Sequence, residues 1–126
     1  KEKKLPPLFK KEVDEKVSEE EVFLSELFRL TLEHSNEFEE LIEKGIRNWE
    51  MDRIATMDMM LLKMAICEFM YMPSIPVRVT LNEYIELAKY YSSPKSRNFI
   101  NGVLDNVLTQ LRAENKLHKK GRGLMG

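Results

Sequence analysis

Residues Thr80 to Leu108 read TLNEYIELAKYYSSPKSRNFINGVLDNVL, and this stretch decides the predicted fold. Apolar residues recur at helical spacing on both sides of a short Ser-Ser-Pro turn at 92–94. The first helix is expected to begin at Thr80, which forms a capping-box pattern with Glu83. Ser93 can cap the second helix, and the proline after it suits a first helical turn. We therefore predict two amphipathic helices joined by a tight turn.

The polar side of this turn is positively charged. Lys89, Lys95 and Arg97 lie within nine residues that contain no acidic residue. Lys95, Ser96 and Arg97 fall in the first turn of the second helix, where free backbone amides and the helix dipole attract phosphate. We predict an anion site or an RNA-backbone site here. The pattern alone leaves open a second interpretation, which is an ordinary solvated helix start.

Charge is distributed unevenly along the chain, although the net charge is only −1. Residues 12–50 contain 13 acidic and 4 basic residues, whereas residues 89–122 contain 2 acidic and 8 basic residues. The sequence therefore predicts an acidic first part and a basic last part. An anionic partner is favoured for the C-terminal end.

Composition indicates a soluble globular protein, because 43% of the residues are hydrophobic and 33% are charged. A length of 126 residues suits one domain with one core. Cys67 is the only cysteine, so no disulfide framework is expected, which fits a cytoplasmic location. The longest apolar run, Met57 to Met72, contains three charged residues, so we predict no membrane association.

Helical spacing of apolar residues extends over most of the chain. It is found at 18–34, 36–46 and 57–71 as well, which gives about five helices and no strand. The helix at 57–71 is apolar nearly all round and is expected at the centre. We predict an all-α fold, a compact orthogonal helical bundle. The predicted parts are a linker or irregular lead-in at 1–17, a helical domain at 18–116 and a basic flexible tail at 117–126.

Catalytic chemistry finds little support in the sequence. The two histidines, His34 and His118, are far apart and belong to no metal-spaced cluster. The chain has no P-loop, dinucleotide fingerprint or nucleophile elbow. We predict a protein that is not an enzyme, with no cofactor and no metal site.

Three segments together resemble one known family. The first segment resembles the C-terminal signature of the NusB family of bacterial antitermination factors, and it reads IELAKYY, a short turn and FINGVLDNVL. The resemblance covers roughly Glu21 to Leu111 and includes two further segments, NWEMDRIATMDMMLLKMAICEF and SIPVRVTLNEYIELAK. It implies a NusB-like helical bundle. The arginine-rich first helix of the family is not found in residues 1–17, so we expect the C-terminal part of a longer NusB-type protein.

The resemblance also implies a function and its residues. Members of the family pair with the ribosomal protein NusE, bind boxA-type RNA in nascent ribosomal transcripts and act within the RNA polymerase antitermination complex. The RNA-binding residues are then expected at the basic turn: Lys89, Tyr91, Lys95, Ser96, Arg97 and Phe99. Lys95 and Arg97 would contact phosphates, Ser96 would add a hydrogen bond, and the aromatic rings would stack on bases or else pack in the core.

Contacts with NusE are expected at the start of the central helix and on nearby surfaces, where the resemblance indicates Asp58 and also Glu68 as acidic partners for a basic protein. Two departures from the family are visible. Lys95 and Arg97 stand where the family commonly has an acidic residue and a histidine. An absent first helix would leave an apolar groove that favours a homodimer.

Two other functions remain open at this stage. The chain could be the RNA-binding domain of a ribosomal RNA cytosine methyltransferase, whose N-terminal module shares this fold. It could also be a non-catalytic helical protein-interaction module that has lost RNA binding.

Overall fold

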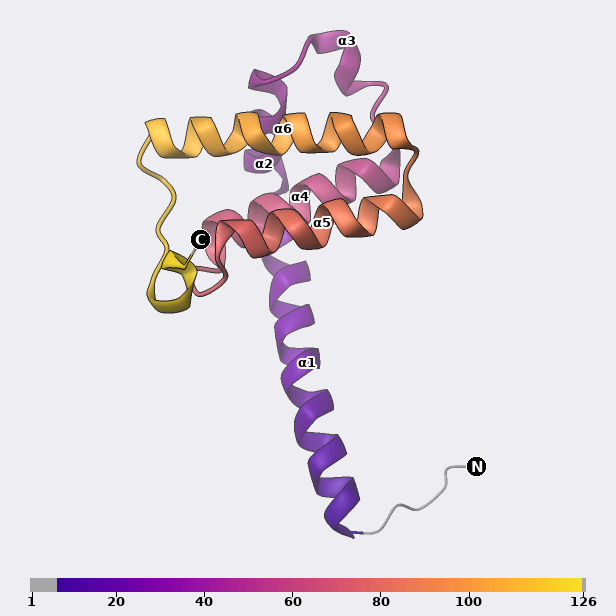
Figure 1. Cartoon of the computed structure of the whole chain (residues 1–126), viewed down its shortest axis with the longest axis vertical. Helices are drawn as coiled ribbons and strands as arrows, with labels where there is room; N and C mark the ends of the chain where they lie inside the picture. Colours follow the sequence, from indigo (N-terminus) through magenta and orange to yellow (C-terminus); the bar gives the residue numbers. More distant parts are fainter. Residues whose placement is uncertain (1–6, 126) are drawn as a thin grey trace.

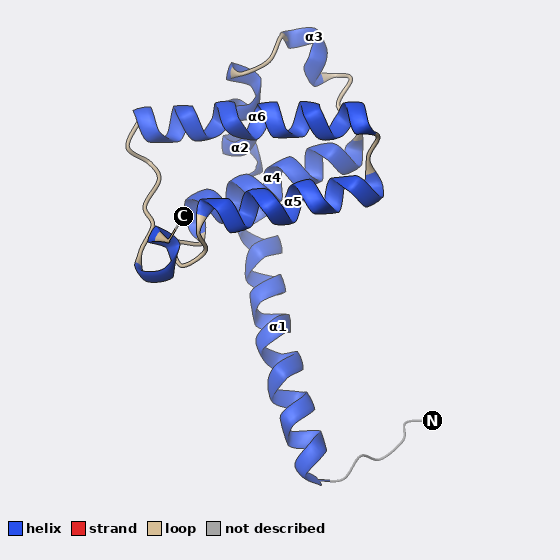
Figure 2. Ribbon diagram, viewed as in Figure 1, coloured by secondary structure: helices blue, strands red, loops and turns tan. Residues whose placement is uncertain are grey.

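A computed structural model of the chain describes the backbone of residues 7–125 and the side chains of 18–125, except those of residues 48 and 49. The elements, in chain order, are α1 (Pro7–Glu33), α2 (Ser35–Lys44), α3 (Asn48–Met51), α4 (Thr56–Tyr71), α5 (Val77–Tyr91), α6 (Pro94–Ala113) and the 3-10 helix η1 (Gly121–Leu124). This described part contains helices and no strand, which confirms the all-α prediction (Figure 2). None of its helices combines the length and the apolar character that a membrane crossing requires.

Helix α4 lies at the centre of the bundle, as its sequence predicts. It contacts α1, α2, α5 and α6. Figure 1 shows α1 running across the direction of α4, α5 and α6, which gives the orthogonal arrangement. Eleven larger side chains are enclosed completely: Phe38, Phe69, Ile42, Leu62, Ile66, Ile100, Leu104, Leu111, Val107, Thr80 and Cys67. A helix without a wide polar face can be buried on every side, and α4 supplies the middle of this core.

Helix α1 begins earlier than predicted. The irregular lead-in expected over 1–17 is wrong for residues 7–17, which are helical, and residues 1–6 lie outside the described residues. Pro7 occupies the first helical position, where its missing N–H removes no hydrogen bond. Leu27 and Thr31, near the end of α1, are buried. The earlier turns of α1 project away from the bundle (Figure 1).

Helix α5 also begins earlier than predicted, and its Thr80 has a different role. The helix starts at Val77, so Thr80 lies inside it and is fully buried instead of capping its start. The Thr80 hydroxyl donates a hydrogen bond of 2.9 Å to the Glu68 carboxylate. The Tyr84 hydroxyl donates a second one, of 2.7 Å, to the other carboxylate oxygen. These two bonds satisfy a carboxylate in the core.

The C-terminal segment is docked on the bundle, so the prediction of a flexible tail is wrong for residues 119–123. The Lys119 ammonium donates hydrogen bonds of 3.0 Å to the backbone carbonyls of Glu68 and Met72, at the end of α4. The Lys120 amide donates to the Pro73 carbonyl at 3.0 Å. Gly123 is buried so close to Pro73 that an added Cβ would lie 1.9 Å from the Pro73 carbonyl oxygen. The tail therefore adds hydrogen bonds to carbonyls at and just after the end of α4, and those of Glu68 and Met72 also accept backbone amides.

The buried Glu68 should make stability depend on pH. Burial raises the pKa of Glu68 above its ordinary value of 4.5, against the opposing effect of its hydrogen bonds to Tyr84 and Thr80. A folded state that holds this proton more tightly gains stability below the ordinary pKa and loses it as pH rises through the raised pKa. We predict that the free energy of unfolding, relative to a Glu68→Gln variant, falls as pH rises above 4.5.

Urea denaturation at a series of pH values checks this prediction. Glu40→Gln, at an exposed position on α2, is the matched control and should leave the pH dependence of the wild type unchanged. Wild-type and Glu68→Gln curves that run parallel over the whole range would contradict the assignment of this titration to Glu68.

Candidate nucleic-acid interface

The turn between α5 and α6 is held by two serines. The Ser93 hydroxyl accepts a hydrogen bond of 3.1 Å from the Ser96 amide, and Pro94 fills the first position of α6. These two features confirm the predicted start of this helix. The Ser92 hydroxyl donates to the Asp58 carboxylate at the beginning of α4, 34 residues away in sequence. The first turn of α6 is therefore fixed against α4.

Two predicted phosphate-binding cations lie in this first turn. The Lys95 side chain is exposed, and the side chains of Ser96 and Arg97 are half-buried. Within the described residues, neither Lys95 nor Arg97 forms an ion pair with a carboxylate. No acidic residue occurs in the first turn of α6. The positive side chains at this helix start are therefore not held in ion pairs with the described residues.

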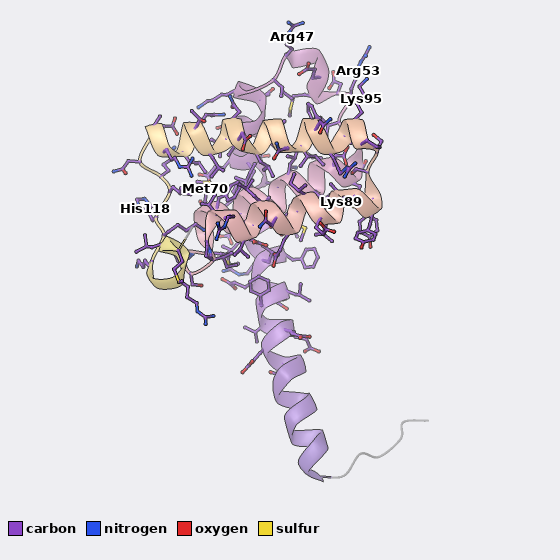
Figure 3. The ribbon with its side chains drawn as sticks, viewed as in Figure 1. Arg47, Arg53, Met70, Lys89, Lys95 and His118 are labelled. Carbon is purple, nitrogen blue, oxygen red and sulfur yellow. The ribbon has the colours of Figure 1, made fainter. Side chains whose placement is uncertain are left out.

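Lys89 is the third predicted cation, and unlike Lys95 and Arg97 it forms an ion pair within the described residues. It lies on α5 at the same end of the bundle (Figure 3), and its ammonium is 3.0 Å from the Glu86 carboxylate. Both side chains are about half exposed, so this ion pair is a weak surface contact. Lys89 could exchange Glu86 for a phosphate at little cost.

The predicted aromatic residues both present a surface to solvent. Tyr91 is 63% exposed, which excludes the core-packing alternative for this side chain. Phe99 is half-buried and packs partly against the core. Tyr90, which was not predicted as a site residue, is 77% exposed beside Tyr91. The available signal was its position next to Lys89, off the apolar stripe of α5.

A cavity of about 370 Å³ opens beside the start of α6. Its lining comes from α3, the connection to α4, the first turns of α4, and α6: Glu50, Arg53, Ile54, Ala55, Asp58, Lys95, Ser96 and Phe99. Arg53 and Lys95 lie at the same end of the molecule (Figure 3). Glu50, Arg53 and Ile54 were not predicted as site residues, because about forty residues separate them from the turn.

The two residues predicted to contact NusE do not form an open acidic surface. Glu68 is only 2% exposed and is bonded to Thr80 and Tyr84, so its assignment as a surface contact is wrong. Asp58 is 5% exposed, holds Ser92 and reaches the cavity. Both carboxylates have structural roles because α4 is enclosed by its neighbours. No three His, Cys, Asp or Glu side chains in the described part of the chain are grouped to hold a metal ion.

Comparison with known proteins identifies the family. The sequence profile described as the NusB family matches residues 2–109. The chain belongs to the NusB family. The match begins at residue 2, so most of the predicted lead-in at 1–17 lies inside the family region.

Three curated relatives are each named transcription antitermination protein NusB. The protein from Salinibacter ruber is 46% identical over 104 residues, which cover 82% of this chain and 65% of that protein. The Chloroherpeton thalassium protein is 37% identical over 103 residues, covering 82% of this chain and 49% of its own length. The Koribacter versatilis protein is 46% identical over 100 residues, covering 78% and 68%. The chain thus spans between about half and two thirds of these relatives.

A solved structure agrees with this assignment. T. maritima NusB superposes on the chain with a TM-score of 0.63 and 30% sequence identity. The superposition covers 68% of this chain and 60% of the T. maritima chain. The NusB-like fold predicted from the sequence is confirmed.

Proposed function

We propose that this chain is an RNA-binding transcription antitermination factor. It acts in the cytoplasm with the ribosomal protein NusE, on boxA-type RNA, within the RNA polymerase antitermination complex. The observation that carries this proposal is the start of α6, where Lys95 and Arg97 have no carboxylate partner among the described residues. The names of the curated relatives support the antitermination role.

In this proposal RNA is bound mainly through its backbone. Lys95 and Arg97 attract phosphates at the positive end of the α6 dipole, and the Ser96 hydroxyl adds a hydrogen bond. The exposed ring of Tyr91 and the half-exposed ring of Phe99 offer stacking surfaces for unpaired bases. This arrangement suits a single strand, whose bases are free to leave the stack.

Reversing both charges at the start of α6 should weaken RNA binding. We predict that Lys95→Glu with Arg97→Glu lowers the affinity for a boxA-type RNA by at least about tenfold, measured by fluorescence anisotropy with NusE present. Replacing the same residues by glutamine should lower the salt dependence, since each lost phosphate contact removes about 0.7 from the slope of log K against log salt.

The matched control carries the same change in charge at the last turn of α6 and just beyond its end, as Arg112→Glu with Lys116→Glu. This control should bind RNA with nearly the affinity of the wild type. Equal losses in the two double variants would mean that net charge alone is responsible. Unchanged binding in the Lys95 and Arg97 variant would remove the turn from the RNA site.

For NusE we propose the exposed start of α4. Met57 and Met60 are 46% and 38% exposed and flank the buried Asp58. Flexible methionine side chains on a surface fit a partner's apolar groups well. The contact is then largely apolar, instead of the purely acidic contact that Asp58 and Glu68 suggested.

A charge placed among these methionines should disrupt that contact. We predict that Met57→Glu reduces the affinity for purified NusE by at least about tenfold, as measured by isothermal titration calorimetry, because a carboxylate would have to be desolvated at the interface. Val79→Glu is the control, since Val79 is exposed to a similar degree (41%) near the other end of the α4–α5 pair. Equal affinities for wild type and Met57→Glu would place NusE elsewhere.

We also propose that the chain forms a homodimer through α1. Several large apolar side chains of this helix are exposed: Val22, Phe23, Leu24, Phe28 and Leu32. Contiguous apolar side chains on a projecting helix favour association with another surface. A second copy presents the same helix, so the contact would be symmetric.

Sedimentation equilibrium tests the dimer. Phe28→Glu should raise the dimer dissociation constant by at least about tenfold, because it inserts a charge into an apolar contact. Leu87→Glu, at an exposed apolar position on α5, should leave the dissociation constant unchanged. A wild-type chain that stays monomeric at every concentration would contradict the proposal.

A further inference from the structure

The cavity beside the start of α6 has features that backbone binding does not use. We propose that it takes one unstacked nucleobase of the bound strand and prefers cytosine to uracil, through the exocyclic amino group. This inference rests on the proposed RNA-binding function and names the base that the site selects. Three properties of the cavity carry it, namely its size and apolar floor, its fixed hydrogen-bond acceptors, and its position next to the phosphate-binding cations.

The size and floor of the cavity suit a flat heterocycle. A volume of about 370 Å³ lies within the range of small-molecule sites. Ile54, Ala55 and Phe99 supply apolar surface, and Phe99 offers an aromatic ring on which a base can stack. A phosphate or a hydrated ion would gain nothing from these side chains. The apolar part of the cavity therefore suits a base, and Lys95 in the same lining suits the attached phosphate.

The acceptors of the cavity are fixed in position. One Asp58 oxygen accepts the Ser92 hydroxyl, and the other has no hydrogen-bond donor among the described residues. One Glu50 oxygen accepts the Arg47 amide at 3.2 Å, which likewise leaves its second oxygen without a described donor. Carboxylate oxygens pair with the amino group of cytosine. Uracil has a carbonyl oxygen at that position, which a carboxylate would repel.

The cavity is continuous with the proposed backbone site. Lys95 belongs both to the lining of the cavity and to the first turn of α6, and Ser96 follows it. A phosphate held at Lys95 would therefore place the attached nucleotide at the cavity mouth. Phosphate contacts fix the register of a strand, and the base contact supplies selection.

Nucleoside monophosphates test this cavity without the rest of the strand. Cytidine monophosphate and uridine monophosphate differ at the amino group in question. In NMR titrations of the full chain, we expect cytidine monophosphate to shift the amide signals of Ala55, Ser96 and Phe99. Its affinity should exceed that of uridine monophosphate by about tenfold, the order of discrimination of one good base contact.

Asp58→Asn gives the sharper comparison. The asparagine oxygen can still accept the Ser92 hydroxyl, which would leave an amide N–H₂ donor facing the cavity. The preference should then reverse in favour of uridine monophosphate. Asp105→Asn, at an exposed position on α6 outside the cavity, should keep the preference of the wild type. If Asp58→Asn does not fold, Glu50→Gln replaces it and should reduce the preference for cytidine monophosphate.

The outcomes separate the two proposals. Equal affinities for the two nucleotides in the wild type, or shifts confined to residues outside the cavity, overturn the base pocket even where RNA binding depends on Lys95 and Arg97. A cytosine preference that Asp58→Asn reverses supports the pocket. A separate result overturns the proposed function, namely an RNA affinity that does not change when the charges of Lys95 and Arg97 are reversed.

Discussion

The packing of α4 against four other helices, which buries or half-buries most of its side chains, is the constraint on which the rest of the structure depends. Its three charged residues, Asp58, Lys63 and Glu68, follow one another at intervals of five, so they leave the helix in three different directions. Each of them meets a different neighbour. Asp58 accepts the hydroxyl of Ser92, before α6, and Glu68 accepts hydroxyls from α5. Lys63 donates to the Glu39 carboxylate on α2 at 2.6 Å. Unpaired charges at such positions would cost several kcal/mol each.

This arrangement also positions the candidate interface. Because Ser92 is bound to Asp58, the α5–α6 turn is fixed to the start of α4, and the cavity forms between them. In this region the side chains of Ser92 and Asp58 are hydrogen-bonded to each other, whereas the Lys95 side chain remains exposed. The hydrogen bond from Ser92 occupies one Asp58 oxygen, and the other oxygen stays beside the cavity. Asp58, which was predicted as a partner contact, instead helps to hold the site together.

Sequence alone predicted the features that depend on local periodicity and capping. The central position of α4 followed from its apolar composition, and the start of α6 followed from Ser93 and the proline after it. Helix α1 starts within the predicted lead-in at 1–17 because its first residue is Pro7, and proline is tolerated in a first helical turn. Thr80 matched a capping pattern by spacing, yet a buried Glu68 twelve residues earlier uses its hydroxyl. Sequence spacing cannot distinguish a threonine that caps a helix from one that lies inside the helix and bonds a buried carboxylate.

The remaining failures concern contacts between distant segments. The hydrogen bond from Lys119 to the Glu68 carbonyl joins residues 51 positions apart, and no local pattern predicts that a basic, glycine-containing tail docks there. The cavity likewise joins Glu50 to Phe99. Photo-crosslinking of a bound boxA-type RNA, with the attachment sites identified by mass spectrometry, tests most directly whether the α5–α6 turn is the RNA interface. The account predicts attachment at Tyr91 and Phe99, and attachment confined to α1 or to residues 114–125 would contradict it.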